Sequence, residues 1–524
     1  MFAIIVTFLA LQTTKNVKYL LVGLAELAII MIISNFLLSK NRRVGLCFNN
    51  LFLLLYNIQM LVLFFGNSFV MLVMLENVGS IEDLSGKAFE YGLGVILLLI
   101  FSFIPIQKLE LSKFKLKSNR CLTIVLAFEL CFTLFWGNTF SPVFAVYRLI
   151  EQKYNLVKQQ QIIDNESEDL TSFFYRDSIG DGRKKDENLT DTPNVILILT
   201  EGLSSNIVFD ERNIMPNLSE LINKSLSFTG YYNHTFATYR GIIGQLYSGY
   251  QNNNTDINTL VSIQDIFRNN GYKTSFVNTE PNNAQFTQYL YTLDFDDTVG
   301  NTETVCNGMA NSISDSDAYE LLFDTALKNE AEDSPFFISM YSFGTHASLD
   351  STDEKFGNGK DRMLNKFYNL DVQLGKFIEK FENSELYDNT ILVFTTDHAT
   401  YADNDFTNAF PDHKRTFVEA DEIPLLIYHN GIEAESIEVE GRNTLDLAPT
   451  ILDYLDISAP NYFLGNSLFL SKQDSAVYET VFSYSDALYD SDNGDLTLFS
   501  DDKKDIIQPL IQKYFMAKQQ ETMK

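Results

Sequence analysis

The sequence contains little cysteine, tryptophan and histidine. Among its 524 residues are 4 Cys, 1 Trp and 5 His. Cys47, Cys121 and Cys131 stand in the first 150 residues, and Cys306 is alone in the remainder. Residues 151–524 therefore cannot contain an internal disulfide, which excludes a fold that depends on a disulfide framework.

Positive charge is scarce in the larger part of the chain. Residues 1–150 contain 12 Lys and Arg against 7 Asp and Glu, whereas residues 151–524 contain 27 against 61. The formal net charge is −29. An acidic surface of this kind repels phosphates, which argues against nucleic acid as a partner. It suits a solvated domain that binds divalent cations.

Long apolar runs occur only near the N-terminus. Four of them are long enough to cross roughly 30 Å of hydrocarbon at about 1.5 Å per residue, and they cover residues 19–38, 51–75, 89–106 and 121–147. Residues 2–11 form a shorter run, which we interpret as a truncated or tilted first span or as an interfacial start. The sequence thus predicts an α-helical transmembrane domain over residues 1–147 with about five spans, or four without the first run.

The charges between these runs predict their orientation. One basic group consists of Lys40, Arg42 and Arg43, and a second lies within residues 108–120, whereas residues 76–87 between them are acidic on balance. The positive-inside rule places both basic groups in the cytoplasm. We therefore expect a multi-pass cell-membrane protein whose chain after about residue 150 is extracytoplasmic. The lack of disulfides there is compatible with a Gram-positive-type bacterium.

The second half shows the pattern of an α/β fold. A juxtamembrane helix and polar linker are expected over residues 148–190. Unbroken apolar runs then suit strands buried on both faces of a mainly parallel sheet, and helical stretches separate them. The runs cover residues 194–202, 273–280, 335–347, 390–399 and 423–431. We predict an extracytoplasmic α/β domain over residues 191–470, extended by helix and loop over residues 471–524.

Polar residues follow several of these runs, at the sheet edge where ligands bind in such folds. Glu201 follows the first, and Asp397 and His398 follow the fourth; carboxylate and imidazole are metal-ligand types. Thr238 precedes a helical segment whose N–H groups can hold a phosphate. Taken singly, each has an ordinary explanation as a helix-start acid, a capping residue or a surface histidine. Together they predict a mononuclear metal site with an activated hydroxyl.

Other histidines are weaker candidates. His346 stands in "SFGTHAS" and His413 in "FPDHKR". His429 follows a strand in a turn, and His234 lies in the loop before Thr238. Taken singly, each is more typical of a satisfied or exposed histidine than of a functional one.

Six segments occur in a recognisable order across about residues 190–470. They are "NVILILTEGLSS", "MPNLSELINKSLSFTGYY", "TYRGIIGQLYSGY", "SFGTHAS", "FTTDHA", and "IPLLIYHNG" with the later "TLDLAPTILDYLDISAPNYFLGNSLF". With these segments the domain resembles the alkaline phosphatase/sulfatase superfamily. Within it, the domain looks most like lipoteichoic acid synthases and related phosphoglycerol transferases, whose membrane layout also resembles the first half of this chain.

The resemblance implies a site and a reaction. One divalent cation, usually Mn²⁺ in the synthases and otherwise Zn²⁺ or Mg²⁺, would be held by Glu201, Thr238, Asp397 and His398. Thr238 would be the nucleophile that takes glycerol phosphate from phosphatidylglycerol and passes it to a surface glycan or a teichoic acid-type polymer. Sulfatases use an oxidised Cys or Ser at this position, and a threonine needs no such oxidation to form a phosphoester. The substrate-binding residues would be His346, His413 and Arg240.

Departures from the family keep alternatives open. Residues 282–291, "NNAQFTQYLY", lack the Trp and Arg of the Trp-Asn-Arg segment in the synthases, so transfer of a single headgroup is at least as well supported as polymerisation. A phosphoethanolamine transferase shares the Thr and metal site but usually has several disulfides and Zn²⁺. A sulfatase-like hydrolase is disfavoured by the missing Cys or Ser. A membrane sensor or scaffold with a degenerate site would not require the four residues to converge.

Overall fold

The computed structural model describes residues 1–76, 87–103, 118–164, 169–254, 256–301, 312–332, 334–472, 477–484, 487–494 and 496–520. Its described residues form two compact units. The helical unit comprises residues 1–76, 87–155 and 402–414, and the α/β unit comprises residues 156–401 and 415–524. Cys306 and most of the loops used above to orient the spans lie outside the described residues.

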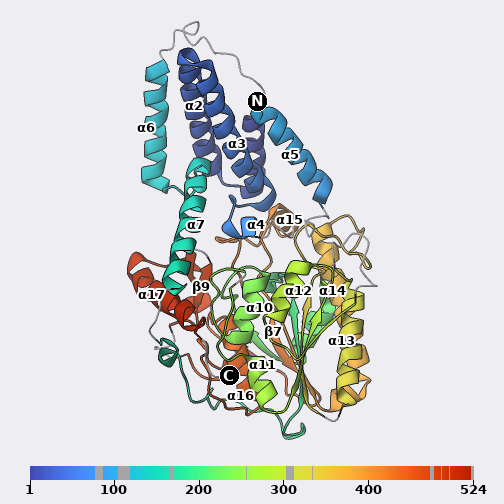
Figure 1. Ribbon diagram of the computed structural model, residues 1–524. Helices are drawn as coiled ribbons and strands as arrows, with labels where there is room; N and C mark the ends of the chain where they lie inside the picture. Colours follow the sequence, from blue (N-terminus) through green and yellow to red (C-terminus); the bar gives the residue numbers. More distant parts are fainter. Residues whose placement is uncertain are drawn as a thin grey trace. The chain divides into compact units, whose positions relative to one another are not determined.

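The N-terminal helices of the helical unit are drawn in blue to cyan in Figure 1, and its segment with α15 is drawn in orange. Its core forms where α1, α2 and α3 pack around Ala10, Met60 and Leu63, all fully buried. Asn41 alone joins α2 to α3, and its side chain accepts hydrogen bonds from the backbone N–H groups of Arg43 and Val44, which caps α3. The helices are α1 (Phe2–Thr14), α2 (Val17–Lys40), α3 (Arg42–Gly66), α4 (Leu72–Glu76), α5 (Ala88–Phe103), α6 (Ser118–Trp136), α7 (Pro142–Asp164), which continues into the α/β unit, and α15 (Asn404–Ala409).

The expectation of about five membrane spans is wrong for the described residues. Among these, α2 and α3 are the two helices long and apolar enough to cross a membrane. α1 and α5 are apolar but have only 13 and 16 residues. The run 121–147 does not form one helix, because α6 ends at Trp136, Gly137 adopts a φ of +71°, and α7 begins at Pro142. The expected span 51–75 is also displaced, since α3 ends at Gly66.

The α/β unit is built around a mainly parallel sheet, as predicted. Within the described residues the strand order is β4-β3-β5-β1-β6-β7-β2-β8. Only β7 runs antiparallel to its neighbours β6 and β2 in this sheet. The strands are β1 (Asn194–Thr200), β2 (Leu226–Thr229), β3 (Lys273–Asn278), β4 (Asp297–Gly300), β5 (Phe336–Ser342), β6 (Thr390–Thr396), β7 (Leu425–Tyr428) and β8 (Glu435–Glu438).

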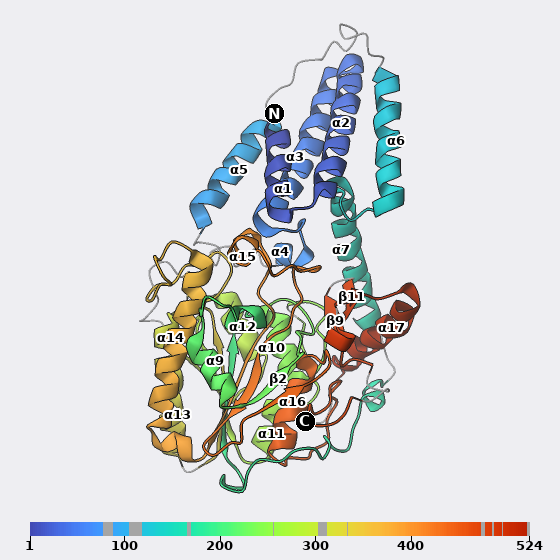
Figure 2. The same ribbon diagram turned by 180° about the vertical axis from the view of Figure 1, so that it is seen from behind.

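Helices cover both faces of this sheet (Figures 1 and 2). One face packs against α9 (Pro216–Asn223), α13 (Asp315–Glu330) and α14 (Arg362–Glu382), and the other against α10 (Thr238–Tyr247), α11 (Ile263–Asn269) and α16 (Leu447–Tyr454). Every residue of β1 is buried, which explains why its sequence does not alternate. Two short helices, α8 (Ser205–Val208) and α12 (Ala284–Tyr291), complete this part.

The C-terminal extension contains more strand than expected. Instead of helix and loop alone, it has a small antiparallel sheet of β9 (Val481–Tyr484), β10 (Ala487–Asp490) and β11 (Thr497–Leu498), followed by α17 (Asp501–Ala517). α17 buries Ile511 and Tyr514 in one apolar cluster with Tyr250 and Leu260. The extension therefore shares a core with the rest of the α/β unit.

Candidate functional site

Three neighbouring strands bring the candidate ligands to one edge of the sheet. β1 lies between β5 and β6, in register with Thr200 opposite Ser342 and Thr396. The backbone pairing continues one residue further, because Glu201 N donates to Ser342 O at 3.0 Å and Asp397 N donates to Thr200 O at 3.0 Å. The side chains that follow β1 and β6 are thereby fixed side by side.

Glu201, Asp397 and His398 form a buried group of metal-ligand type, with one ligand atom from each residue lying within 4.8 Å of the others. The His398 Nε2 atom is 3.4 Å from Glu201 Oε1 and 3.4 Å from Asp397 Oδ2. Thr238 joins the group, since its hydroxyl donates to Glu201 Oε2 at 3.0 Å. The structure thus brings together all four residues that the sequence singled out as metal ligands.

Hydrogen bonds orient the side chains of this group, but one carboxylate oxygen has no hydrogen-bond partner. Asp397 Oδ1 accepts the backbone N–H groups of Gly202 at 2.8 Å and His398 at 2.7 Å. Asp397 Oδ2 is buried and has no hydrogen-bond partner. The His398 Nδ1 atom lies 2.8 Å from Ala399 O, so Nδ1 carries the proton and Nε2 presents its lone pair to the carboxylates. An unpaired buried carboxylate oxygen beside an imidazole lone pair fits a divalent cation.

The pKa values of Glu201, Asp397 and His398 are shifted because these three side chains are buried close together. Burial alone would raise the pKa of Glu201, but His398, His346 and the hydroxyls of Tyr341 and Thr238 together lower it. Burial raises the pKa of Asp397, and the neighbouring charge of Glu201 raises it further. Burial opposes protonation of His398, yet the two carboxylates raise its pKa. A bound cation would replace these protons as the counter-charge.

Thr238 is the first residue of α10, and Ala237 is the N-cap. Its hydroxyl contacts Glu201 instead of capping the helix, and the side chain is half-buried. Gly241 permits this placement, because a Cβ there would lie 2.2 Å from Asp397 O. The start of α10 can therefore approach the end of β6, and a helix N-terminus at this position favours a nearby anion.

His346 lies in the loop after β5, close enough to Glu201 and His398 to interact with both electrostatically. Its ring stacks on Phe343 at a centroid distance of 4.7 Å, and Nδ1 is 3.0 Å from Ala347 O. Burial lowers the pKa of His346, although Glu201 partly opposes this. The stacking and the backbone contact fix the orientation of the His346 ring beside the metal-ligand group.

Arg240 is buried and linked to the metal-ligand group through aromatic rings. Its guanidinium lies over Tyr484 at 5.1 Å from the centroid. Tyr484 packs against Phe236 at 5.8 Å, and Phe236 packs against His398 at 4.7 Å. Through these contacts Arg240 supports the position of the His398 ring, and its role in substrate binding stays a prediction.

The remaining histidines occupy other environments. His413 belongs to the helical unit, 6.0 Å from the ring of Phe406. The His234 ring hydrogen-bonds Thr444, and burial lowers its pKa to about 3. His429 Nε2 lies 2.8 Å from Tyr454 OH. The latter two are accounted for by packing and hydrogen bonding.

Sequence reasoning missed two residues that hold Glu201. The Tyr341 hydroxyl, on β5, donates to Glu201 Oε2, and Thr345 Oγ1 donates to Glu201 O at 2.5 Å. The available signal was weak, since Tyr341 is only a polar ring near the end of an apolar run. Its position beside the first residue after β1 follows from strand order, which the sequence does not specify.

Comparison with known proteins identifies the family of the α/β unit. The sulfatase family profile matches residues 193–457. Lipoteichoic acid synthase 2 of Bacillus subtilis is 24% identical over 166 residues, which cover 27% of this chain and only 24% of that protein. An alkaline phosphatase superfamily protein from Vibrio parahaemolyticus shares the fold, with a TM-score of 0.52 and 19% identity over 65% of this chain and 89% of its own. The lipoteichoic acid synthase LtaP from Listeria monocytogenes aligns at a TM-score of 0.46 with 18% identity, over 64% of this chain and 94% of its own.

Proposed function

Since this chain belongs to the sulfatase family, we propose that it is a membrane-anchored phosphotransferase that moves a phosphoryl headgroup from a lipid through a phosphothreonine at Thr238. The proposed donor is phosphatidylglycerol, and the proposed acceptor is a hydroxyl of a surface glycan or teichoic acid-type polymer. A hydroxyl that donates to a buried carboxylate within a metal-ligand group supports transfer through an enzyme ester.

A divalent cation, proposed to be Mn²⁺, would be held by Glu201, Thr238, Asp397 and His398. When bound, it would lower the pKa of the threonine hydroxyl and offset charge on the phosphoryl oxygens. His398 is prepared for this role by its Nδ1 contact with Ala399, and Asp397 by its unpaired Oδ2.

The side chains of the α/β unit account for the remaining chemistry. Glu201 accepts the hydrogen bond of Thr238 and is placed to receive its proton. The freed oxygen attacks phosphorus, a bond from Thr238 Oγ1 to phosphorus forms, the P–O bond to diacylglycerol breaks, and the proton held by Glu201 passes to the departing diacylglycerol oxygen. An acceptor hydroxyl then gives its proton to Glu201 and attacks phosphorus, the P–O bond to Thr238 breaks, and the proton returns to Thr238 as its hydroxyl is restored. The first N–H groups of α10 face developing negative charge, and His346 contacts the phosphoryl or headgroup oxygens.

The division of the chain supports a lipid donor. We propose that the transmembrane part, residues 1–147, keeps the catalytic part, residues 191–470 with its extension 471–524, at the outer face of the cell membrane. α2 and α3 supply two apolar helices long enough for anchoring. A membrane-anchored enzyme meets a lipid substrate at high effective concentration.

One observation carries the proposal: the Thr238 hydroxyl hydrogen-bonds Glu201 in the same buried group as the unpaired Oδ2 of Asp397. The test is peptide mass spectrometry of the full chain after incubation with Mn²⁺ and phosphatidylglycerol. We expect a glycerophosphoryl adduct on Thr238 that is absent from Thr238→Ala. Phosphatidylethanolamine is tested in parallel, and an adduct from it alone would reassign the headgroup. No adduct from either lipid, with Mn²⁺ bound, would refute the transferase.

A further inference from the structure

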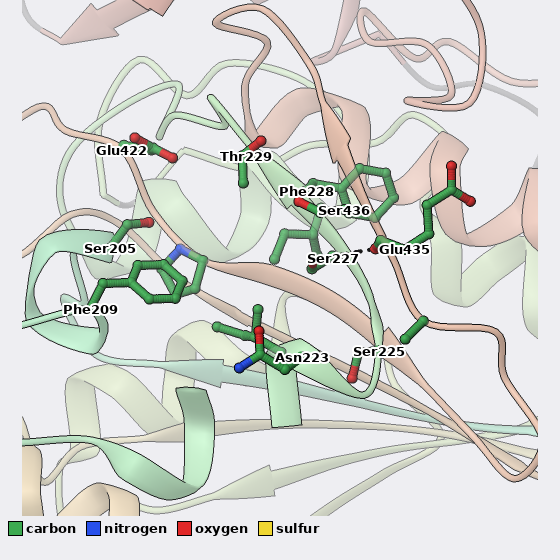
Figure 3. Close-up of a pocket in the computed structure, with 14 residues that line it drawn as sticks. Ser205, Phe209, Asn223, Ser225, Ser227, Phe228, Thr229, Glu422, Glu435 and Ser436 are labelled. Atoms are coloured by element: carbon green, nitrogen blue, oxygen red, sulfur yellow. Dashed lines mark hydrogen bonds between the residues drawn. The ribbon is translucent and has the colours of Figure 1, made fainter. Parts of the chain in front are cut away.

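A cavity of the α/β unit, apart from the metal-ligand group, lies among β2, β7, β8 and the ends of α8 and α9 (Figure 3). It encloses about 300 Å³, near the lower limit of small-molecule sites, which range over roughly 300–1,000 Å³. Ser205 and Phe209 lie on one side of it, and Ser227, Ser436 and Glu435 on the other. Ser205 stands four residues after Glu201 in the sequence, so the segment that leaves the metal-ligand group also forms a wall of this cavity.

Hydroxyl and amide groups dominate the polar lining. Some are already used: Ser225 Oγ donates to Leu221 O at 2.6 Å, and Thr229 Oγ1 donates to Glu438 Oε2 at 2.8 Å. By contrast, within the described part of the chain the side chains of Ser205, Asn223 and Ser436 make no hydrogen bond. These three can each both donate and accept, which matches a ligand that carries hydroxyl groups.

An aromatic ring stands beside these groups. The Phe209 side chain is 54% exposed although it lines the cavity, and in Figure 3 its ring extends toward the centre. Pro424 and Leu425 add apolar surface. A flat apolar face combined with convergent hydroxyls is suited to the two sides of a sugar ring, its C–H face and its hydroxyl edge.

The charge of the lining disfavours an anionic ligand. The titratable residues that line the cavity are the carboxylates Glu422 and Glu435, with no Lys, Arg or His among the described lining residues. Arg183 pairs with Glu435 from outside the lining, which leaves Glu422 to repel a phosphate or carboxylate. From the unbonded hydroxyls, the exposed ring and the lack of a positively charged side chain in the lining, we propose that this cavity binds a neutral sugar of one or two rings.

Sugar binding itself is independent of transfer chemistry. Its role as the anchor of a glycan acceptor rests on the proposed function, because only a transferase needs to retain an acceptor. The two proposals therefore fail separately: the sugar should bind Thr238→Ala as it binds the parent chain, whether or not Thr238 forms an ester.

Saturation-transfer NMR on the full chain in lipid nanodiscs tests the site, since nanodiscs avoid glycoside detergents. The probes are maltose and N,N′-diacetylchitobiose, with glycerol and inorganic phosphate as comparisons. We expect transfer to at least one disaccharide, no transfer to phosphate, and affinity at least about tenfold lower in Phe209→Ala, equivalent to about 1.4 kcal/mol. Displacement by a maltose-headed lipid would indicate a lipid-linked sugar, and lack of displacement a polymeric one.

Matched variants separate the site from general effects. Phe173→Ala removes a ring of nearly equal exposure, 53%, elsewhere in the α/β unit and should leave binding unchanged. Ser436→Tyr fills the cavity from the exposed face of β8 and should abolish binding with the melting temperature retained. Equal binding by the parent chain and Ser436→Tyr, preferential binding of phosphate, or no binding of either disaccharide would overturn the proposal.

Discussion

Two of the buried groups of charged side chains in the α/β unit differ in how their charge is balanced. In one, Arg442 Nε lies 2.8 Å from Asp446 Oδ2 and Arg442 Nη2 lies 3.0 Å from Glu479 Oε1, so the carboxylates have a cation of their own. In the other, Glu201 and Asp397 lie beside the imidazole of His398, and His346 also interacts with Glu201 electrostatically. Arg442 thus offsets part of the carboxylate charge in the first group, whereas the second group has only histidine imidazoles beside its carboxylates. This difference makes the second group the candidate metal site.

The largest expected effect is on chemistry. Asp397→Asn removes a proposed ligand while keeping the side-chain volume, so headgroup transfer should fall by about 10³-fold. Without metal, the Asp397→Asn variant should be at least as stable as the metal-free parent chain, because a buried charge is removed. Adduct formation measures transfer, and chemical unfolding in the presence of a chelator measures the stability of both proteins. Parent-like transfer by Asp397→Asn would show that the cluster does not need the ion.

The Arg442 group should respond in the opposite way. Arg442→Met leaves Asp446 and Glu479 buried without their cation, and the free energy of unfolding should fall by about 3–5 kcal/mol. Mn²⁺ should still raise the melting temperature of whatever fraction folds, because the metal-ligand group is intact. A stability change below 1 kcal/mol would remove the contrast between the two groups.

The stabilisation by Mn²⁺ should grow with pH. In the metal-free protein the pKa values of Asp397 and His398 are raised, so both residues stabilise the fold below their unfolded pKa values, and this contribution is lost as the pH rises through the raised values. The lowered pKa of Glu201 acts only at lower pH. A cation binds the deprotonated forms, and at 100 times its Kd it adds about 2.7 kcal/mol.

Thermal melting with Mn²⁺ or chelator between pH 5.5 and 8 measures this effect. The difference between the two conditions should increase steadily with pH in the parent chain and disappear in Asp397→Asn. A difference that is constant with pH would indicate an ion bound elsewhere.

The smallest expected effect concerns Tyr341. Tyr341→Phe removes the hydroxyl that donates to Glu201 but keeps the ring, so transfer should slow by about 10- to 100-fold, in line with about 1.5–3 kcal/mol for one hydrogen bond to a charged group. Mn²⁺ affinity should weaken with it, and this separates an effect on Glu201 from a loss of packing. Tyr319→Phe, on α13 and also buried, is the matched control and should leave both unchanged.

Much of the site followed from the sequence because it depends on local pattern. The resemblance to the sulfatase superfamily is confirmed by the profile match over residues 193–457. Glu201 and Asp397 each follow an apolar run, and parallel strands bring such positions to one edge. Strand direction and order are set by tertiary packing, so neither the antiparallel β7 nor the neighbour Tyr341 was predicted.

The helical region was predicted less well for a physical reason. Hydropathy measures how long an apolar run is, but it does not detect a residue that interrupts the helix within that run. Gly137, with its left-handed φ, and Pro142 divide an apolar stretch that composition alone presents as continuous. The assignment of residues 402–414 to the helical unit was not predicted either, because this segment, which contains His413, follows β6 of the α/β unit in the sequence.

The placement of β1 between β5 and β6 also has a consequence for the order of events during biogenesis. Glu201 and His398 stand far apart in the sequence, and they meet only after β6 has paired with β1. A nascent chain therefore offers no ready chelate, and the ion cannot template the early stages of folding. Metal identity should accordingly be decided by the ions present in the compartment where the sheet closes, and by none encountered during synthesis.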